Sequence, residues 1–147
     1  MNKVFVTSLL ILQSLAANAE VIDIDTTEFA RLLDQRVPVI DVRTAPEWEE
    51  SGIVAGSHLF TYFDRNGKSD PAAWLEKART VAKPEEPVIL ICRSGNRTKA
   101  VSRFLSDQAG YARVYAVKGG IQAWAGAGRP LVPAAQAIAT CRAKQHC

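Results

Sequence analysis

The sequence predicts an α/β fold: one domain with a mostly parallel central sheet and helices on both faces. Short, β-branched apolar segments alternate along the chain with segments of helical period. The connections between them are short, which is typical of strand–helix–strand units. The length of 147 residues and the hydrophobic share of 48% fit a single globular domain.

The first half of the sequence predicts two strands and three helices. Residues 21–24 read as a short strand, and residues 37–42 are nearly all apolar, as in a strand buried on both faces. Asp25, with a glutamate three residues later, resembles a capping box that opens a helix. Pro46 and Pro71 suit the first turns of two further helices, because a helix needs no amide hydrogen there.

The second half contains the strongest predicted strand, residues 87–92. It ends in the polar segment 93–97, which favours a loop. Apolar residues then recur at helical spacing over residues 98–110. Residues 114–117 form the next predicted strand, and after a Gly-Gly turn residues 121–125 form a short helix.

The N-terminal segment predicts a signal peptide over residues 1–19. A lysine near the start, the apolar run 4–12 and the small-x-small pattern at 17–19 are the signs of cleavage before Glu20. The apolar run falls short of the ~20 residues that a membrane-spanning helix needs. We therefore expect an exported protein, periplasmic in a bacterium and free of the membrane after cleavage. The mature chain divides into a domain, 20–128, and a C-terminal tail, 129–147.

Three cysteines are present: Cys92, Cys141 and Cys147. An oxidising compartment permits disulfides, and an odd count leaves one thiol unpaired. Cys141 and Cys147 are close in sequence and can bond to each other. Cys92 is then the free thiol.

Charge and histidine content predict neither a nucleic-acid partner nor a metal. The net charge is +3, with acidic and basic residues interspersed rather than grouped in a stripe. His58 has no cysteine or histidine neighbour at ligand spacing. No apolar, periodic segment is left over to indicate an oligomer interface, so the oligomeric state stays open.

The junction after the strongest strand predicts a reactive cysteine. In an open α/β sheet, ligands gather where strand ends meet helix starts, and Cys92 stands at such a point. Gly95 lets the backbone curl, and successive amides in such a curl form an anion-binding nest. Arg93 and Arg97 add positive charge, so the thiolate is favoured as a nucleophile. A cysteine at the end of a buried strand can also be an unreactive core residue. A core cysteine would not need an anion-binding loop after it, so the segment 93–97 favours the reactive interpretation.

The segment Cys92–Thr98 resembles the active-site loop of single-domain rhodaneses. Three other segments agree with that family in order and spacing, and the resemblance covers residues 21–126. They are 41–48, with Asp-Val-Arg and Glu-Trp, 51–58, rich in glycine, and 110–124, with Gly-Gly-Ile-Gln-Ala-Trp. Many rhodaneses have Gly-His-Ile where this chain reads Ser51-Gly52-Ile53, in a segment that is mostly structural in the family.

The resemblance implies a rhodanese-like domain that moves sulfur without a cofactor. Cys92 would take sulfur from a small anionic donor such as thiosulfate and pass it to cyanide or a thiol. Asp41 and Arg43 would support the pocket, more as a structural ion pair or cap than as catalysts. The substrate-binding residues implied are Arg93, Ser94, Gly95, Asn96, Arg97 and Thr98. Arg93 is the first choice for holding the donor, and Arg97 either shares that role or braces the loop.

Three alternatives to a sulfurtransferase remain. Phosphatases and arsenate reductases of the same fold have a loop one residue longer, with arginine six positions after the cysteine. Here Arg97 is five positions after Cys92 and position six is Thr98, which favours sulfur transfer. A thioredoxin-like role normally requires a second cysteine three positions on, where this chain has Gly95. A non-catalytic persulfide carrier or sensor stays open.

Overall fold

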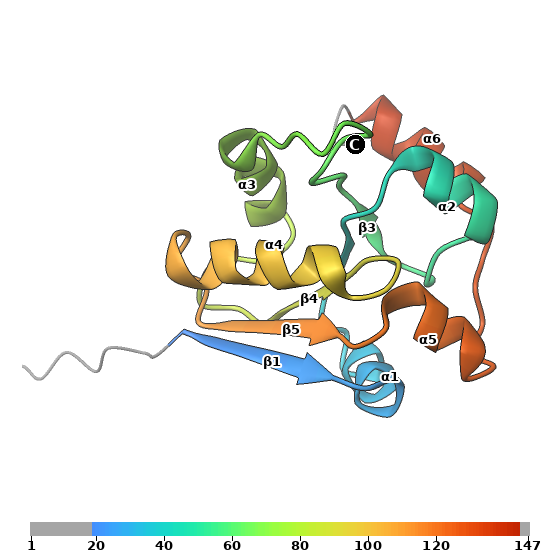
Figure 1. The fold of residues 1–147 in the computed structure, drawn as a ribbon, viewed down its shortest axis with the longest axis horizontal. Coiled ribbons are helices and arrows are strands. Elements are labelled where there is room, and N and C mark those ends of the chain that lie inside the picture. Colours follow the sequence, from blue (N-terminus) through green and yellow to red (C-terminus); the bar gives the residue numbers. More distant parts are fainter. Residues whose placement is uncertain (1–18, 145–147) are drawn as a thin grey trace, which may run out of the picture.

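The computed structural model describes residues 19–144, which form one sheet and six helices (Figure 1). The strands are β1 (Glu20–Ile24), β2 (Val39–Asp41), β3 (His58–Leu59), β4 (Val88–Ile91) and β5 (Arg113–Val117). The helices are α1 (Thr26–Asp34), α2 (Ala45–Ser51), α3 (Pro71–Arg79), α4 (Asn96–Asp107), α5 (Gly120–Gly126) and α6 (Ala135–Ala143). No helix in this part of the chain is long and apolar enough to cross a membrane. Apart from Ala19, the predicted signal peptide lies outside the described residues, so export stays a prediction.

The five strands form a single sheet in the order β1-β5-β4-β2-β3, and every pair is parallel. This confirms the predicted α/β fold. Because all the strands run the same way, their carboxyl ends lie at one edge of the sheet. β4 is the central strand, and the amide of Val42 donates to the carbonyl of Ile91 at 3.0 Å. The residues that follow β2 and β4 therefore lie side by side.

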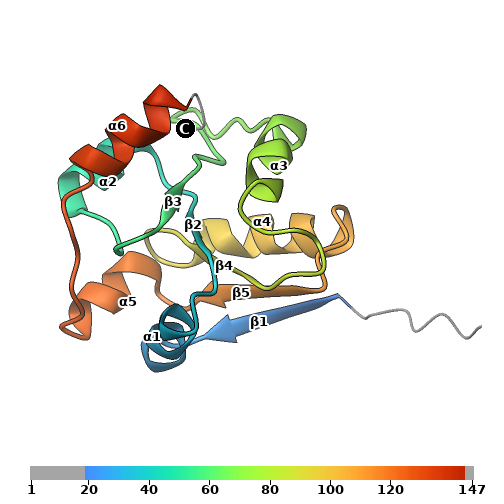
Figure 2. The same cartoon turned by 180° about the vertical axis from the view of Figure 1, so that it is seen from behind.

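Helices cover both faces of the sheet, as Figures 1 and 2 show from opposite sides. Alternate residues of β4 point to opposite faces. Val88 and Leu90 pack with α3 and α4, whereas Ile89 and Ile91 pack with residues of α1 and α5. Cys92, the next residue, belongs to the α3–α4 side. The alternation of one buried strand therefore aims the cysteine toward α4.

The segment predicted as a C-terminal tail packs against the β3 edge of the sheet. Val132 pairs with Ile53 in an isolated antiparallel bridge. Ile138 and Cys141 of α6 lie in a third core cluster, together with Trp48 of α2. Cys141 is disulfide-bonded. Its predicted partner, Cys147, lies outside the described residues, so this pairing stays a prediction.

The helix starts follow the predicted local chemistry, with one shift. The Asp25 side chain accepts hydrogen bonds from the amides of Thr27 and Glu28, which opens α1. The Glu28 carboxylate binds Arg31, so the reciprocal half of the expected capping box does not form. The expected helix over residues 98–110 begins at Asn96, two residues earlier. The reason is Gly95, which takes φ +92° and turns the chain directly into the first helical turn. The loop after Cys92 is consequently shorter than its polar sequence suggested.

Candidate active site

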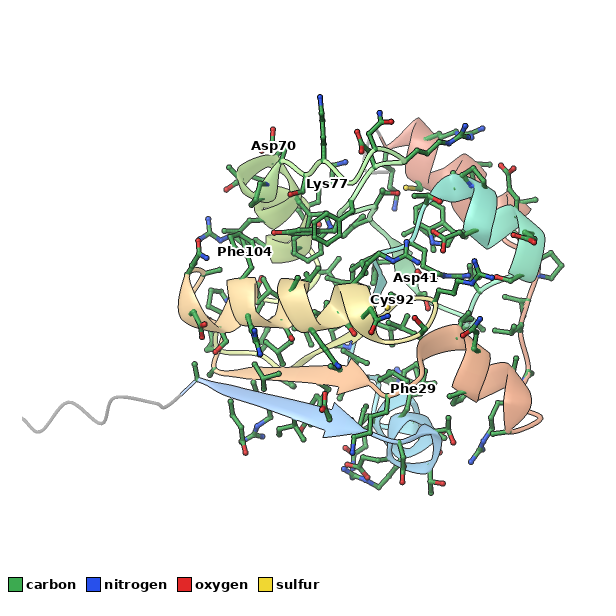
Figure 3. The ribbon with its side chains drawn as sticks, in the orientation of Figure 1. Phe29, Asp41, Asp70, Lys77, Cys92 and Phe104 are labelled. Carbon is green, nitrogen blue, oxygen red and sulfur yellow. The ribbon has the colours of Figure 1, made fainter. Side chains whose placement is uncertain are left out.

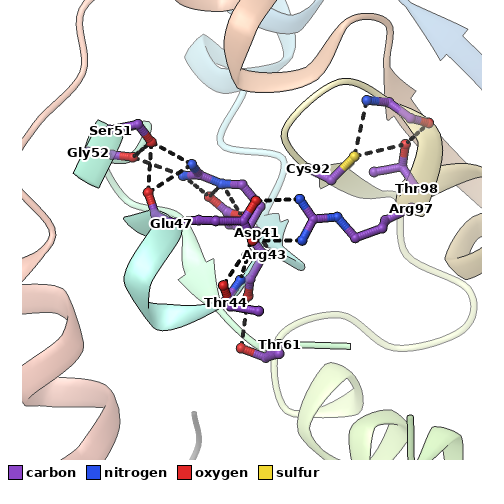
Figure 4. Close-up of polar contacts among 11 residues, drawn as sticks. Asp41, Arg43, Thr44, Glu47, Ser51, Gly52, Thr61, Cys92, Arg97 and Thr98 are labelled. Atoms are coloured by element: carbon purple, nitrogen blue, oxygen red, sulfur yellow. Dashed lines mark hydrogen bonds and ion pairs between the residues drawn. The ribbon is translucent and has the colours of Figure 1, made fainter. Parts of the chain in front are cut away.

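Cys92 lies between the end of β4 and the start of α4, and its side chain is 1% exposed. The amide of Gly95 donates a hydrogen bond to Cys92 Sγ at 3.1 Å. Thr98 Oγ1 lies 4.0 Å from the sulfur, and its hydroxyl donates to the Gly95 carbonyl at 2.9 Å. An amide dipole and a helix N-terminus both favour negative charge. The Cys92 sulfur therefore lies beside the first turn of α4, in contact with Thr98 (Figures 3 and 4).

The loop directs the Gly95 amide to the sulfur and leaves three polar residues exposed to solvent. Arg93, Ser94 and Asn96 are exposed, whereas Gly95 and Thr98 are buried. A Cβ at Gly95 would lie 3.3 Å from the amide nitrogen of Gly119, which is tight, and φ +92° disfavours any side chain. The curl predicted from the sequence is thus made by the main chain around one glycine.

The first turn of α5 holds the start of the loop. The amide of Ile121 donates to the carbonyl of Cys92 at 2.8 Å, and the amide of Gln122 donates to the carbonyl of Arg93 at 3.2 Å. Both carbonyls thus point toward α5. Gly120 permits this approach, because a Cβ there would lie 2.2 Å from the Cys92 carbonyl oxygen. The absence of a side chain at Gly120 therefore lets α5 hold the backbone of Cys92 in place.

Gly120→Ala is expected to displace the loop and to destabilise the fold by more than ~2 kcal/mol, since left-handed backbone strain alone costs an L-residue about 1–2 kcal/mol. Gly110→Ala is the matched control: its φ of +74° carries similar strain, but nothing lies within 4 Å of a Cβ there. Urea unfolding and sulfur-transfer assays of both variants check this. Equal losses in the two would contradict a specific role for the α5 contact.

The Arg97 side chain binds Glu47 of α2. Its guanidinium donates to the two carboxylate oxygens of Glu47 at 2.6 and 2.7 Å, so the pair is bidentate (Figure 4). Glu47 also accepts from the amide and hydroxyl of Thr44, at 3.0 and 2.9 Å, within the capping box of α2. The first turns of α2 and α4 are therefore joined through these two side chains.

The pair fixes the charge of Glu47 over a wide pH range. The hydrogen bonds from Arg97 lower the pKa of the Glu47 carboxyl from 4.5 to about 2, and those from Thr44 act in the same direction against burial. Glu47 in turn raises the pKa of Arg97. Both groups are therefore ionised at neutral pH.

Acid should weaken this link. Because the folded pKa of Glu47 lies below its ordinary value, the link is expected to contribute its full stability above pH 4.5 and to lose it as pH falls through about 2. The stability gap between the wild type and Glu47→Gln should therefore shrink on acidification, as measured by thermal unfolding between these values. Glu76→Gln, which removes an exposed ion pair with Arg79, is the control. If the stability differences of Glu47→Gln and Glu76→Gln from the wild type depended equally on pH, the lowered pKa of Glu47 would be contradicted.

Asp41 and Arg43 form a buried ion pair, with side chains 0% and 1% exposed. Arg43 Nη2 donates to Asp41 Oδ2 at 2.8 Å, and Nε donates to the same carboxylate. The remaining guanidinium hydrogens reach the Glu47 carbonyl at 3.3 Å, the Ser51 hydroxyl at 2.6 Å and the Gly52 carbonyl at 2.9 Å. Arg43 therefore holds the C-terminal end of α2 to β2, and all of its donor groups face protein.

Arg93 differs from the other two arginines near Cys92, because it forms no ion pair with any residue in 19–144. It lines a cleft of 290 Å³ between α2 and α5, whose walls include Glu50 and Gln122. A larger cavity, of 630 Å³, lies between β3 and α6 and does not include Cys92. Cys92 is not among the residues that line the smaller cleft either. Arg93 is thus a cation next to Cys92 in the chain, without an ion-pair partner among the described residues. No three histidine, cysteine or acidic side chains among the described residues are grouped to hold a metal ion.

Only some of the predicted site residues contact the Cys92 sulfur or each other. Cys92, Gly95 and Thr98 share hydrogen bonds, whereas Ser94 and Asn96 contribute main chain to the loop. In the sequence, Glu47 stood out only as part of the Glu-Trp pair in the segment 41–48 that resembles the family. Glu47 lies three residues after Thr44, and this spacing indicates a capping box. It does not indicate that Glu47 also binds Arg97.

Comparison with known proteins agrees with this geometry. Residues 25–127 match the model of the rhodanese-like domain. The chain is 47% identical to the thiosulfate sulfurtransferase GlpE of Actinobacillus pleuropneumoniae serotype 3 over 47 residues, which are 32% of this chain. This match spans 43% of the relative, which is less than half of its length.

Two solved structures share the fold. The crystal structure of Rv0390 from M. tuberculosis has a TM-score of 0.64 at 21% identity, covering 78% of this chain and 98% of that one. A Rhodopseudomonas palustris protein described as of unknown function and as a possible tyrosine phosphatase has a TM-score of 0.56 at 21% identity, covering 86% and 99%. At such identities these likenesses show the fold alone. Because the family model spans most of the chain and the loop geometry agrees with it, this protein belongs to the rhodanese-like domain family.

Proposed function

We propose that this protein is a sulfurtransferase that carries a sulfane sulfur as a persulfide on Cys92. The observation that supports this most directly is the buried Cys92 sulfur, which accepts the Gly95 amide at the start of α4. A terminal persulfide sulfur is a small anion, and a curl of backbone amides suits one such atom. The GlpE relative is named a thiosulfate sulfurtransferase, which supports thiosulfate as the donor.

The first half-reaction is a displacement at sulfur. The Cys92 thiolate attacks the outer sulfur of thiosulfate, the sulfur–sulfur bond of the donor breaks, and sulfite leaves with the bonding electron pair. The product is a Cys92 persulfide anion, so the total charge is unchanged. Arg93 would hold the leaving sulfite; its exposure next to Cys92 and its lack of an ion pair among the described residues support this role.

In the second half-reaction an acceptor takes the outer sulfur. Cyanide attacks that sulfur, thiocyanate leaves, and the Cys92 thiolate is restored with no net change in charge. A thiol acceptor would take the sulfur as its own persulfide. The Gly95 amide meets the cysteine sulfur in the resting state, and the same loop would surround the added sulfur in the intermediate.

A phosphatase is the second candidate, because one structural neighbour is described as a possible tyrosine phosphatase. Such an enzyme needs cationic and amide donors around a tetrahedral oxyanion. Here Arg97 follows the cysteine by five positions, and its guanidinium is bound to Glu47. Both features favour sulfur transfer.

The test is direct detection of the intermediate. The mature protein is incubated with thiosulfate, and the peptide that contains Cys92 is examined by mass spectrometry. We expect a mass gain of one sulfur atom that disappears on addition of cyanide, with thiocyanate formed in proportion. Hydrolysis of p-nitrophenyl phosphate without any persulfide would overturn the proposal in favour of the phosphatase.

A further inference from the structure

We propose that the cavity between β3 and α6 is a second ligand site, which binds a small aliphatic carboxylate through Ser57, His58 and Lys144. The cavity has a volume of 630 Å³, and Cys92 is not among the residues that line it. Small-molecule sites usually occupy about 300–1,000 Å³, so the cavity is large enough for such a ligand. The site is separate from Cys92, and the inference does not depend on the proposed sulfur transfer.

The cavity has apolar walls that belong to the rigid part of the fold. Ile53, Leu59 and Phe60 line it and are only 2–4% exposed, so the core holds them in place. α6 packs against β3 at the edge of the sheet (Figure 2). Val132, which precedes α6, lines the cavity and is 38% exposed, although large apolar side chains are otherwise mostly covered in residues 19–144. A ligand with an apolar body would shield these walls from water.

The Ser57 hydroxyl is a buried polar group without a partner. Ser57 lines the cavity and is 8% exposed, and its Oγ forms no hydrogen bond with any described residue. Leaving a buried hydroxyl unpaired costs free energy, so such groups usually have a hydrogen-bond partner. An oxygen of a ligand in the cavity would supply that partner.

The charge of the cavity wall is positive. Lys144 lines the cavity and forms no ion pair with another residue in 19–144. Its charge reaches His58, because partial burial and then Lys144 lower the pKa of that imidazole. None of the described residues that line the cavity is acidic. The wall therefore favours an anionic group over a neutral or cationic one.

A carboxylate on an aliphatic chain matches both properties of the cavity. Ser57 and His58 are consecutive, and Lys144 is close enough to act on His58, so the proposal places one carboxylate among the three. Its two oxygens offer about four acceptor positions, enough for several donors. The aliphatic chain would lie against the apolar walls. A small, strongly hydrated anion would gain nothing from those walls, so the apolar body is part of the predicted specificity.

The test is titration calorimetry of the purified protein with three probes: octanoate, 1-octanol and acetate. The protein is kept oxidised, because Cys141 in the cavity wall is disulfide-bonded. Octanol keeps the apolar body without the charge, and acetate keeps the charge without the body. We expect one octanoate per chain, bound at least about 10-fold more tightly than either of the other probes, since both kinds of contact are needed.

Two substitutions separate the contributions. Lys144→Met should weaken octanoate binding roughly 3- to 10-fold, because a cation at an open cavity is partly screened, and should leave octanol binding unchanged. Lys68→Met is the matched control, since Lys68 is exposed and does not line the cavity. Ser57→Ala should weaken octanoate binding by roughly 10-fold, without lowering the free energy of unfolding of the unliganded protein.

Arg93→Met distinguishes this cavity from the loop after Cys92 and should bind octanoate like the wild type. Loss of octanoate binding in Arg93→Met would place the ligand beside the loop and overturn the inference. Failure of the wild type to bind octanoate would overturn it as well, and so would equal affinities of the wild type and Lys144→Met. A large loss of stability in Ser57→Ala would contradict the assignment of this hydroxyl to a ligand.

Discussion

Replacing Cys92 by serine is expected to lower thiocyanate formation from thiosulfate and cyanide by at least about a thousandfold, because the nucleophile itself is removed. A serine hydroxyl does not ionise at neutral pH and cannot hold a persulfide. The Gly95 amide can still donate to the serine oxygen, so the free energy of unfolding should change by only about 1 kcal/mol. Steady-state thiocyanate assays and urea unfolding of the purified variant check both parts.

The control is the double variant Cys141→Ser/Cys147→Ser, which should keep sulfur transfer. Cys141 lies in the cluster between α2 and α6, away from the loop, and it is disulfide-bonded. Loss of activity in this double variant, with the fold intact, would show that the tail cysteines take part in the reaction. Retained activity in Cys92→Ser would remove Cys92 as the sulfur carrier.

The largest expected loss of stability is that of Arg43→Met. The change leaves the Asp41 carboxylate buried at 0% exposure without its cation, and it removes the bonds to Ser51 and Gly52 at the end of α2. Breaking one side of a buried pair costs about 3–5 kcal/mol. For a domain of this size, the thermal midpoint should fall by about 10 °C or more.

Arg31→Met is the matched control, since it breaks an exposed pair with Glu28 within α1. Exposed pairs contribute about 0–1 kcal/mol, so this variant should unfold close to the wild type. Calorimetry of both variants gives the comparison. A loss for Arg43→Met no greater than that for Arg31→Met would show that the buried network does not hold α2.

Much of the fold could be predicted from local patterns. The strands at residues 87–92 and 114–117 and the helix start after Asp25 correspond to β4, β5 and α1 within one or two residues. Each has a strong local cause: a continuous β-branched run or a capping side chain. β3 was not predicted, because a strand of two residues has no periodicity, and it exists through its pairing with β2.

The sequence by itself determined that Cys92 stands at the end of a buried strand, that a glycine-centred polar loop follows, and that Arg97 lies five positions after Cys92. These features depend on residues that are close together in the sequence, so they can be predicted from local chemistry and spacing. Only the tertiary structure showed which residue binds the Arg97 side chain, because its partner Glu47 is 50 positions away and comes from another helix. The same holds for Gly120, whose lack of a side chain lets α5 fix the Cys92 carbonyl. Contacts between distant segments depend on how the helices pack around the sheet, and no local pattern of residues records that packing.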